Sequence, residues 1–310
     1  MTRKLIGNIT TSLCVISLVT GCAVNSSKVA DTKPTNGHVN GTVISITPIK
    51  VPDTSPNVKT FKMMYWSDNT RTVAYMSVPI KSGSYPLLVN CHGGFSFAMQ
   101  ETHVPSPANQ DTLEGASSTF IQVVPEYRGY DDSDGTVPGL DGETLDTNNA
   151  IKAVESHYHV KPDHIDLLGT SMGGAVVLKL ASERTDIHSV LAVSPFVGWD
   201  SMGEWAKNNL KNPAASKWYN DMTTVYGPFK PSSPKYQAVS IDYTKIHAPT
   251  LLLQGTADPT VPWQSVQFFY NELKHTNKNT HLILVPGAGH GVHDKAGQND
   301  INQWYVETGM

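Results

Sequence analysis

One stretch decides how this chain folds, and it reads Ile165-Asp166-Leu167-Leu168-Gly169-Thr170-Ser171-Met172-Gly173-Gly174-Ala175-Val176-Val177-Leu178. The apolar start predicts a buried strand and the end predicts a helix, so the chain must turn sharply between them. The Gly-x-Ser-x-Gly spacing is typical of a nucleophile elbow, although a glycine-rich loop can match it by chance. Glycines let strand and helix approach closely, while Ser171 takes a strained backbone conformation at the head of the helix. That position favours an oxyanion beside the serine.

Short, almost continuously apolar runs lie on both sides of this stretch at helix-length intervals. Such runs are typical of parallel strands covered by helices on both faces. They are Leu87–Asn90, Phe120–Val124, Ile165–Leu168, Val190–Val193, Thr250–Leu253 and His281–Val285. The helices that we expect between and after them are Asp146–His157, Met172–Glu183, Trp263–His275 and Asp294–Val306.

The first part of the chain has a different pattern, in which apolar and polar residues alternate without a helical period. Three antiparallel strands are predicted there, containing Val43–Ile46, Thr60–Trp66 and Thr72–Pro79, with a hairpin turn at Ser67–Thr70. The sequence therefore predicts an α/β fold in which a mostly parallel central sheet follows an antiparallel beginning. One domain, residues 41–310, is expected to contain all of these strands.

Residues 198–243 fit the strand and helix rhythm poorly. This segment is rich in proline and in aromatic residues, namely Trp199, Trp205, Trp218, Tyr219, Tyr226 and Tyr236. It predicts a small helical cap inserted over the carboxyl ends of the strands, where ligands bind in open α/β sheets. Some of these aromatic side chains are expected simply to pack on one another.

Composition limits the possible classes of protein. The chain has 310 residues, of which 39% are hydrophobic and 16% charged, and its formal net charge is −4. These values are typical of a globular protein and argue against a nucleic-acid partner, since no basic block is present. After the N-terminus, no stretch approaches the roughly 18 apolar residues that a spanning helix needs.

The N-terminus predicts export. Arg3 and Lys4 precede a mostly apolar core that ends in small residues before Cys22. This arrangement resembles the lipobox of bacterial lipoproteins, which implies a signal peptide over residues 1–21, lipidation of Cys22 and a membrane anchor on the extracytoplasmic side. Residues 22–40 would be a flexible tether. An ordinary cleaved signal peptide with an incidental Cys22 is the alternative.

The mature domain would keep a single cysteine. Cys14 lies in the predicted signal peptide and Cys22 would carry lipid, so only Cys91 remains and no disulfide is available. Cys91 belongs to an apolar strand, and a buried, inert thiol is the expectation there.

A serine nucleophile needs a base and a group that orients this base. Asp258 follows the strand that contains Thr250–Leu253, and His290 follows the next strand within Gly287-Ala288-Gly289-His290-Gly291. The order Ser, Asp, His along the chain is that of the α/β-hydrolases. Two alternatives stay open: Asp258 could cap the helix that begins near Val261, and His293 could be the base.

Three motifs together resemble the α/β-hydrolase superfamily, and specifically the prolyl oligopeptidase (S9) catalytic domain and its esterase relatives. They are Gly169-Thr170-Ser171-Met172-Gly173-Gly174, Gln254-Gly255-Thr256-Ala257-Asp258-Pro259-Thr260-Val261-Pro262 and Gly287-Ala288-Gly289-His290. The resemblance covers about residues 60–305. It implies that Ser171 is the nucleophile, Asp258 the orienting acid and His290 the base, with no cofactor.

The predicted oxyanion hole has one donor at the amide of Met172, directly after the nucleophile. The segment Cys91-His92-Gly93-Gly94-Phe95 resembles the His-Gly-Gly motif of esterases and S9-type hydrolases, which places the second donor amide at Phe95 or its neighbour Gly94. Some prolyl oligopeptidase relatives have a tyrosine where His92 stands, so a side-chain donor at this position stays open.

Other polar residues are given structural roles. Arg128, in Tyr127-Arg128-Gly129-Tyr130, resembles the Arg-Gly segment of the same superfamily and is expected to pair with a carboxylate. His157, His159 and His164 are close in sequence but lack accompanying ligands at metal spacing, so surface histidines are expected and no metal site is predicted.

These motifs favour a serine hydrolase that cleaves carboxylic esters or small peptides through an acyl-enzyme. The S9 peptidases carry a propeller before the catalytic domain, and its absence from the short segment before the first family-like strand favours an esterase. A noncatalytic lipoprotein that uses the fold as a binding scaffold is the alternative from another class. A haloalkane dehalogenase is disfavoured because it needs a carboxylate at position 171.

Overall fold

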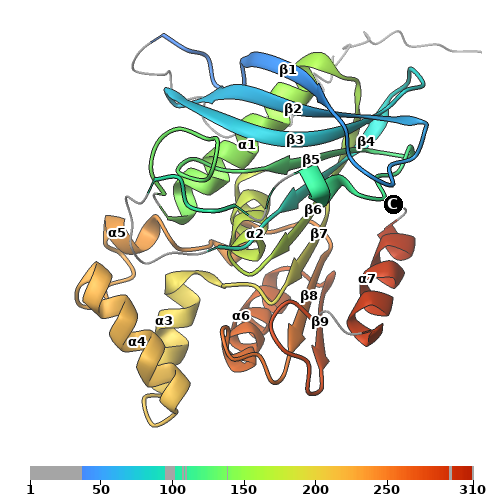
Figure 1. The fold of residues 1–310 in the computed structure, drawn as a ribbon. Helices are drawn as coiled ribbons and strands as arrows, with labels where there is room; N and C mark the ends of the chain where they lie inside the picture. Colours follow the sequence, from blue (N-terminus) through green and yellow to red (C-terminus); the bar gives the residue numbers. More distant parts are fainter. Residues whose placement is uncertain are drawn as a thin grey trace, which may run out of the picture.

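The computed structural model describes residues 37–94, 102–106, 108, 110–137, 139–292 and 295–308. A nine-stranded sheet runs through these residues in the order β1-β2-β3-β5-β4-β6-β7-β8-β9 (Figure 1). Its strands are β1 (Val43–Ile49), β2 (Val58–Ser67), β3 (Thr70–Pro79), β4 (Tyr85–Cys91), β5 (Ile121–Pro125), β6 (Val160–Thr170), β7 (Ile187–Val193), β8 (Thr250–Gly255) and β9 (Thr280–Val285).

Strand directions divide the sheet into two parts. β1, β2, β3 and β5 pair antiparallel, whereas β5, β4, β6, β7, β8 and β9 pair parallel. The chain runs from β4 outward to β5 and then returns to β6 on the other side of β4, so the strand order reverses between β4 and β6. Ligands bind at such a reversal in open α/β sheets, outside the carboxyl ends of the strands.

Helices cover the sheet on both faces. They are α1 (Leu140–His157), α2 (Met172–Glu183), α3 (Gly198–Asn208), α4 (Pro213–Tyr226), α5 (Pro234–Gln237), α6 (Trp263–Thr276) and α7 (Lys295–Thr308), with short 3₁₀ turns at Gln110–Leu113 and Tyr243–Lys245. Alternate residues of β7 point to the two layers: Val190 and Ala192 join the large core under α1, α2 and α6, and Leu191 and Val193 join the smaller core under α7. Together with the sheet, these layers form an α/β-hydrolase fold, as predicted.

Every predicted strand is present, and the predicted hairpin turn pairs Ser67 with Thr70. Its two central residues, Asp68 and Asn69, have φ of 47° and 65°. Positive φ at both central residues is typical of a type I′ turn, whose twist matches that of the flanking strands.

One helix boundary differs clearly from the prediction. α1 begins at Leu140 rather than at Asp146, because its polar first turns are buried by the surrounding structure. The hydroxyls of Thr144 and Thr147 donate to the carbonyls of Leu140 and Glu143, four residues earlier. A sequence pattern based on apolar spacing misses turns of this kind because their buried residues are polar.

The segment predicted as a cap lies between β7 and β8 and contains α3, α4 and α5 (Figure 1). α4 begins at a proline, and the Asn212 side chain caps it by accepting from the amides of Ala214 and Ala215. Aromatic rings hold the segment together. Trp199 lies within aromatic contact of Phe196, Trp218 and Tyr226, with ring centroids 4.9, 5.5 and 6.0 Å away.

The predicted signal peptide, Cys22 and most of the predicted tether lie outside the described residues. Within the described ranges, none of the helices has the length and apolar character of a membrane span.

Candidate active site

Ser171 lies at the turn between β6 and α2. This turn is at the carboxyl end of β6, beside the point between β4 and β6 where the strand order reverses. The φ of Ser171 is +60° and its ψ is −119°, a strained conformation for a residue with a side chain. Its amide donates to the carbonyl of Val193 at 2.9 Å, and its carbonyl accepts from the amide of Phe196 at 3.0 Å. These two bonds fix the turn to the end of β7, and the geometry is that of the predicted elbow.

The glycines of the motif are required by close contacts. A Cβ on Gly169 would lie 2.1 Å from the carbonyl oxygen of Gly173, and a Cβ on Gly173 would lie 2.0 Å from that of Cys91. Both distances are far shorter than any contact a real Cβ makes, so only glycine lets α2 start this close to β4 and β6.

Asp258 and His290 come together from the loops that follow β8 and β9. Nδ1 of His290 lies 2.8 Å from Oδ2 of Asp258, whose side chain is fully buried, and the His290 side chain keeps 28% of its surface exposed. Burial would raise the pKa of Asp258, but hydrogen bonds from His290, Gln254 and the amides of Thr260 and Val261 outweigh it and hold this pKa below its ordinary value. The carboxylate therefore stays ionised and orients the imidazole.

The alternative that Asp258 caps the following helix is not confirmed, because α6 begins at Trp263 after the N-cap Pro262 and has no side-chain cap. The two oxygens of Asp258 have different partners. Oδ1 accepts from the amides of Thr260 and Val261 at 2.8 and 2.9 Å, which orders the loop before α6. Oδ2 faces His290. His293, the other candidate base, lies outside the described residues.

The loop that carries His290 is tied to the elbow by Ser194. The amide of Gly291 donates to the Ser194 hydroxyl at 3.1 Å, and Ser194 directly follows Val193, whose carbonyl accepts from the Ser171 amide. Ser194 is fully buried, and its φ is +45°. Two hydrogen bonds and two peptide links, from His290 to Gly291 and from Ser194 to Val193, therefore connect His290 and Ser171, which are far apart in the sequence.

Ser194→Ala is expected to lower kcat for the hydrolysis that the motifs predict by about tenfold to a hundredfold, with little change in KM. Without the hydroxyl, the loop loses its anchor beside the elbow, and a small displacement of His290, the predicted base, costs rate. Steady-state kinetics checks this, with Ser182→Ala as a control because the Ser182 hydroxyl bonds only within α2. A kcat equal to that of the wild type would show that Ser194 does not position the loop.

The loop after β4 passes directly in front of Ser171. A Cβ on Gly93 would lie 3.1 Å from the Cβ of Ser171, so this backbone is in contact with the elbow. Met172 is the first residue of α2, and such an amide has no partner within its helix. Gly94 accepts a hydrogen bond from the Tyr130 hydroxyl through its carbonyl. Phe95, the other predicted donor, lies outside the described residues.

The side chain of His92 contacts the backbone of this loop. It is buried, and its ring stacks on that of Tyr127 at 4.3 Å. Its two ring nitrogens face the backbone carbonyls of Gly93 and Glu126. A ring held in this way orders the loop, so His92 is a structural residue here.

Glu126 is the residue whose backbone carbonyl faces the His92 ring. Its carboxyl is buried and accepts hydrogen bonds from the Ser133 hydroxyl and the Asp132 amide. Burial raises its pKa from an ordinary value of 4.5 to about 7. Between these two pH values the folded protein holds a proton that the unfolded chain has released. The contribution of Glu126 to the free energy of unfolding therefore falls as the pH rises through this window.

Glu126→Gln is expected to reduce this fall. Between about pH 5 and about pH 8, urea denaturation should show a loss of stability smaller than that of the wild type by on the order of 1–2 kcal/mol. Glu114→Gln, at an exposed carboxyl, serves as the control and should leave the pH dependence unchanged. Identical pH profiles for Glu126→Gln and the wild type would mean that Glu126 is ionised in the folded protein at both pH values.

Two further predictions from the sequence are confirmed. Arg128 pairs with the buried Asp146 of α1 at 2.7 Å and also reaches Ser67 in the β2–β3 turn, so it holds elements together away from Ser171. Cys91 is buried and free, and burial raises the pKa of its thiol to about 12. Among the described residues, no three His, Cys, Asp or Glu side chains gather as a metal site would require.

Three residues around the site were missed by sequence reasoning: Ser194, Tyr130 and Gln254. Gln254 donates from its amide nitrogen to Oδ2 of Asp258 at 3.0 Å and to the carbonyl of Val261. The signal that could have found it is a polar residue within an apolar strand, which needs a specific partner once buried. Ser194 and Tyr130 carry no comparable signal because their partners are backbone groups of other loops.

The sheet order, the elbow and the loops that follow the strands define a protein of the α/β-hydrolase class. Residues 141–307, more than half of the chain, match the model of the prolyl oligopeptidase family (Peptidase S9), and the chain belongs to this family. A peptidase of Bacillus subtilis that bears the name YtmA is 24% identical over 232 residues, which cover 74% of this chain and 85% of YtmA.

Two more similarities agree with this class. The protein YfhR of Escherichia coli is 28% identical over 167 residues, 53% of this chain and 51% of YfhR, so the match spans about half of that relative. The crystal structure of acetyl xylan esterase 1 from Thermoanaerobacterium matches with a TM-score of 0.60 at 19% identity, covering 85% of this chain and 88% of that chain. The family identifies a hydrolase, and the solved structure shows that the fold is shared with an esterase.

Proposed function

We propose that Ser171, Asp258 and His290 form a catalytic triad and that this protein hydrolyses carboxylic esters through an acyl-enzyme. The observation that carries this proposal is the 2.8 Å contact between His290 and Asp258 on a loop that is bonded beside the Ser171 elbow. A nucleophile, a base and an orienting carboxylate are the three parts that an acyl transfer of this kind requires.

In the proposed reaction, Nε2 of His290 takes the proton of the Ser171 hydroxyl while the serine oxygen attacks the ester carbonyl. The Met172 amide and a second amide from residues 94–95 donate to the oxyanion. The tetrahedral intermediate collapses as His290 returns the proton to the leaving alcohol. Water then attacks the acyl-serine with His290 again as the base, which releases the acid and restores the enzyme.

Apolar surroundings of the elbow support an uncharged acyl group. Phe196 bonds to the Ser171 carbonyl through its amide, and its ring stacks with that of Trp218 from α4 at 6.3 Å. The acetyl xylan esterase neighbour supports an ester substrate. The name of YtmA supports the second candidate, hydrolysis of small peptides or amides.

A substrate panel tests the proposal. Purified protein should hydrolyse p-nitrophenyl esters of short acids with a kcat/KM at least about a hundredfold above that for aminoacyl p-nitroanilides. Ser171→Ala provides the background for both series. The reverse preference would assign the protein to the peptidases, and activity with neither series would favour the noncatalytic binding scaffold.

The proposal includes an exported lipoprotein anchored through Cys22, which rests on the N-terminal sequence alone. Cys22→Ser is expected to move the protein from the membrane fraction to the soluble fraction, since a lipidated cysteine supplies the anchor. Fractionation of bacteria that express the full chain, with immunoblotting, measures this. Cys14→Ser is the matched control and should stay in the membrane. A Cys22→Ser protein that remains membrane-bound would contradict lipidation as the anchor.

A further inference from the structure

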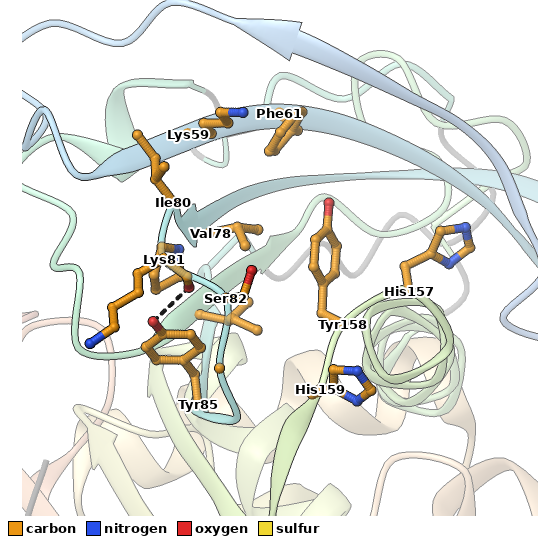
Figure 2. A pocket seen from close by; sticks show the side chains of 13 residues that line it. Lys59, Phe61, Val78, Ile80, Lys81, Ser82, Tyr85, His157, Tyr158 and His159 are labelled. Carbon is orange, nitrogen blue, oxygen red and sulfur yellow. Dashed lines mark hydrogen bonds between the residues drawn. The ribbon is translucent and has the colours of Figure 1, made fainter.

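A pocket lies at the opposite end of the parallel strands from Ser171. Its walls come from the end of β3, the β3–β4 loop, the start of β4 and the link between α1 and β6 (Figure 2). Tyr85 and Cys91 pair with Val160 and Gly169 at the two ends of β4. Six residue steps of about 3.3 Å separate these ends, so the pocket is about 20 Å from the elbow. It is therefore no part of the candidate active site.

Aromatic and aliphatic side chains form the floor of this pocket. Its volume is about 340 Å³, within the range of small-molecule sites. Figure 2 shows the ring of Tyr158 standing in the middle, with its hydroxyl toward Phe61 on β2 and with Val78 beside it. Tyr85 closes one side, and its hydroxyl donates to the Lys81 carbonyl at 2.7 Å. A lining of this kind can bind a flat apolar group such as an aromatic ring.

The lining side chains that can carry a charge near neutral pH are all basic, although the chain as a whole is acidic. Lys59, Lys81, His157 and His159 line the pocket, and no Asp or Glu is among the lining residues. Lys59 extends over the pocket toward Phe61, whereas Lys81 points outward past Tyr85 (Figure 2). Neither lysine forms an ion pair with any carboxylate in the described part of the chain. A pocket with this charge attracts an anion.

Unused hydrogen-bonding groups lie beside this charge. Within the described ranges, the Tyr158 hydroxyl has no hydrogen-bond partner, and the same is true of the Ser82 hydroxyl, which points up into the pocket in Figure 2. Both hydroxyls are therefore free to donate to an anionic ligand in the pocket. A charge-assisted bond of this kind is stronger than one between neutral groups.

We propose that this pocket is a second ligand site that binds a small aromatic carboxylate. Its ring would pack among Phe61, Val78 and Tyr158, and its carboxylate would accept hydrogen bonds from Lys59 and the Tyr158 hydroxyl. The site is independent of the proposed hydrolysis, because none of its groups reaches Ser171.

Titration of the full-length protein with 3-phenylpropanoate tests the site, with binding followed by amide chemical shifts in NMR. Shifts should appear at residues 78–85 and 157–160, and the neutral 3-phenylpropanamide should bind at least about tenfold more weakly. Lys59→Gln should weaken carboxylate binding by a similar factor, and added salt should weaken it in the wild type. Lys211→Gln, at an exposed lysine between α3 and α4, should bind as the wild type does.

Ser82→Trp is a second variant that tests the pocket by filling it. Ser82 is exposed in a loop, so the fold should tolerate the change while the indole occupies the space of the ligand ring. Loss of the localised shifts in Ser82→Trp supports the proposal. Equal affinity for carboxylate and amide would overturn it, and so would shifts confined to the residues around Ser171.

Discussion

Ser171→Ala is expected to lower the turnover of p-nitrophenyl esters by on the order of a million-fold and to abolish labelling by a fluorophosphonate probe. Ser171 stands at the head of α2 with a backbone φ of +60°, and Ser194 links this turn to the loop of the His290–Asp258 pair. Where a triad acts as a unit, loss of the nucleophile removes nearly all of its contribution. Gel fluorescence and steady-state kinetics on the same preparation measure both effects.

The fold should survive this change, because the Ser171 side chain is half-buried and its hydroxyl takes part in none of the hydrogen bonds among the described residues. Circular dichroism and the urea midpoint should therefore match those of the wild type within error. Ser182→Ala, on the same helix, is the matched control and should keep full activity and labelling. Undiminished hydrolysis by purified Ser171→Ala would overturn the assignment of the nucleophile.

His290→Ala is the second large expected effect, a loss of about three to six orders of magnitude in kcat. Without the imidazole, no base accepts the serine proton, and Asp258 cannot replace it because its carboxylate is buried and faces away from solvent behind the ring. The double variant with Ser171→Ala should lose no more than the worse single variant, since residues of a unit are not additive. Kinetics on all three variants provides this test.

His293→Ala is the control that separates the two candidate bases. His293 follows His290 by three residues in the sequence. Its removal should change kcat by less than about tenfold, which corresponds to roughly 1.4 kcal/mol. If His293→Ala were the inactive variant and His290→Ala the active one, the base would be His293. The pair of His290 with Asp258 would then serve only to order the loop.

Local sequence determined much of this protein. Strands buried on both faces are continuously apolar, so all parallel strands could be located from hydrophobic runs alone. Gly169 and Gly173 are needed for a backbone approach that no other residue allows, which made the Ser171 elbow predictable from spacing. Asp258 and His290 stand directly after strands, and the carboxyl ends of parallel strands meet at one edge, so their meeting followed from order along the chain.

Tertiary structure alone decided which polar groups are buried and what they contact. The first turns of α1 look like a loop in the sequence, and they are helical because burial makes their backbone hydrogen bonds necessary. Ser194 anchors the His290 loop through Gly291, 97 residues away, and Gln254 supports Asp258 across a turn. The pocket at the opposite end of the strands is lined by residues of β2, the β3–β4 loop and the end of α1. Such contacts depend on the packing of distant segments, which no local pattern of residues encodes.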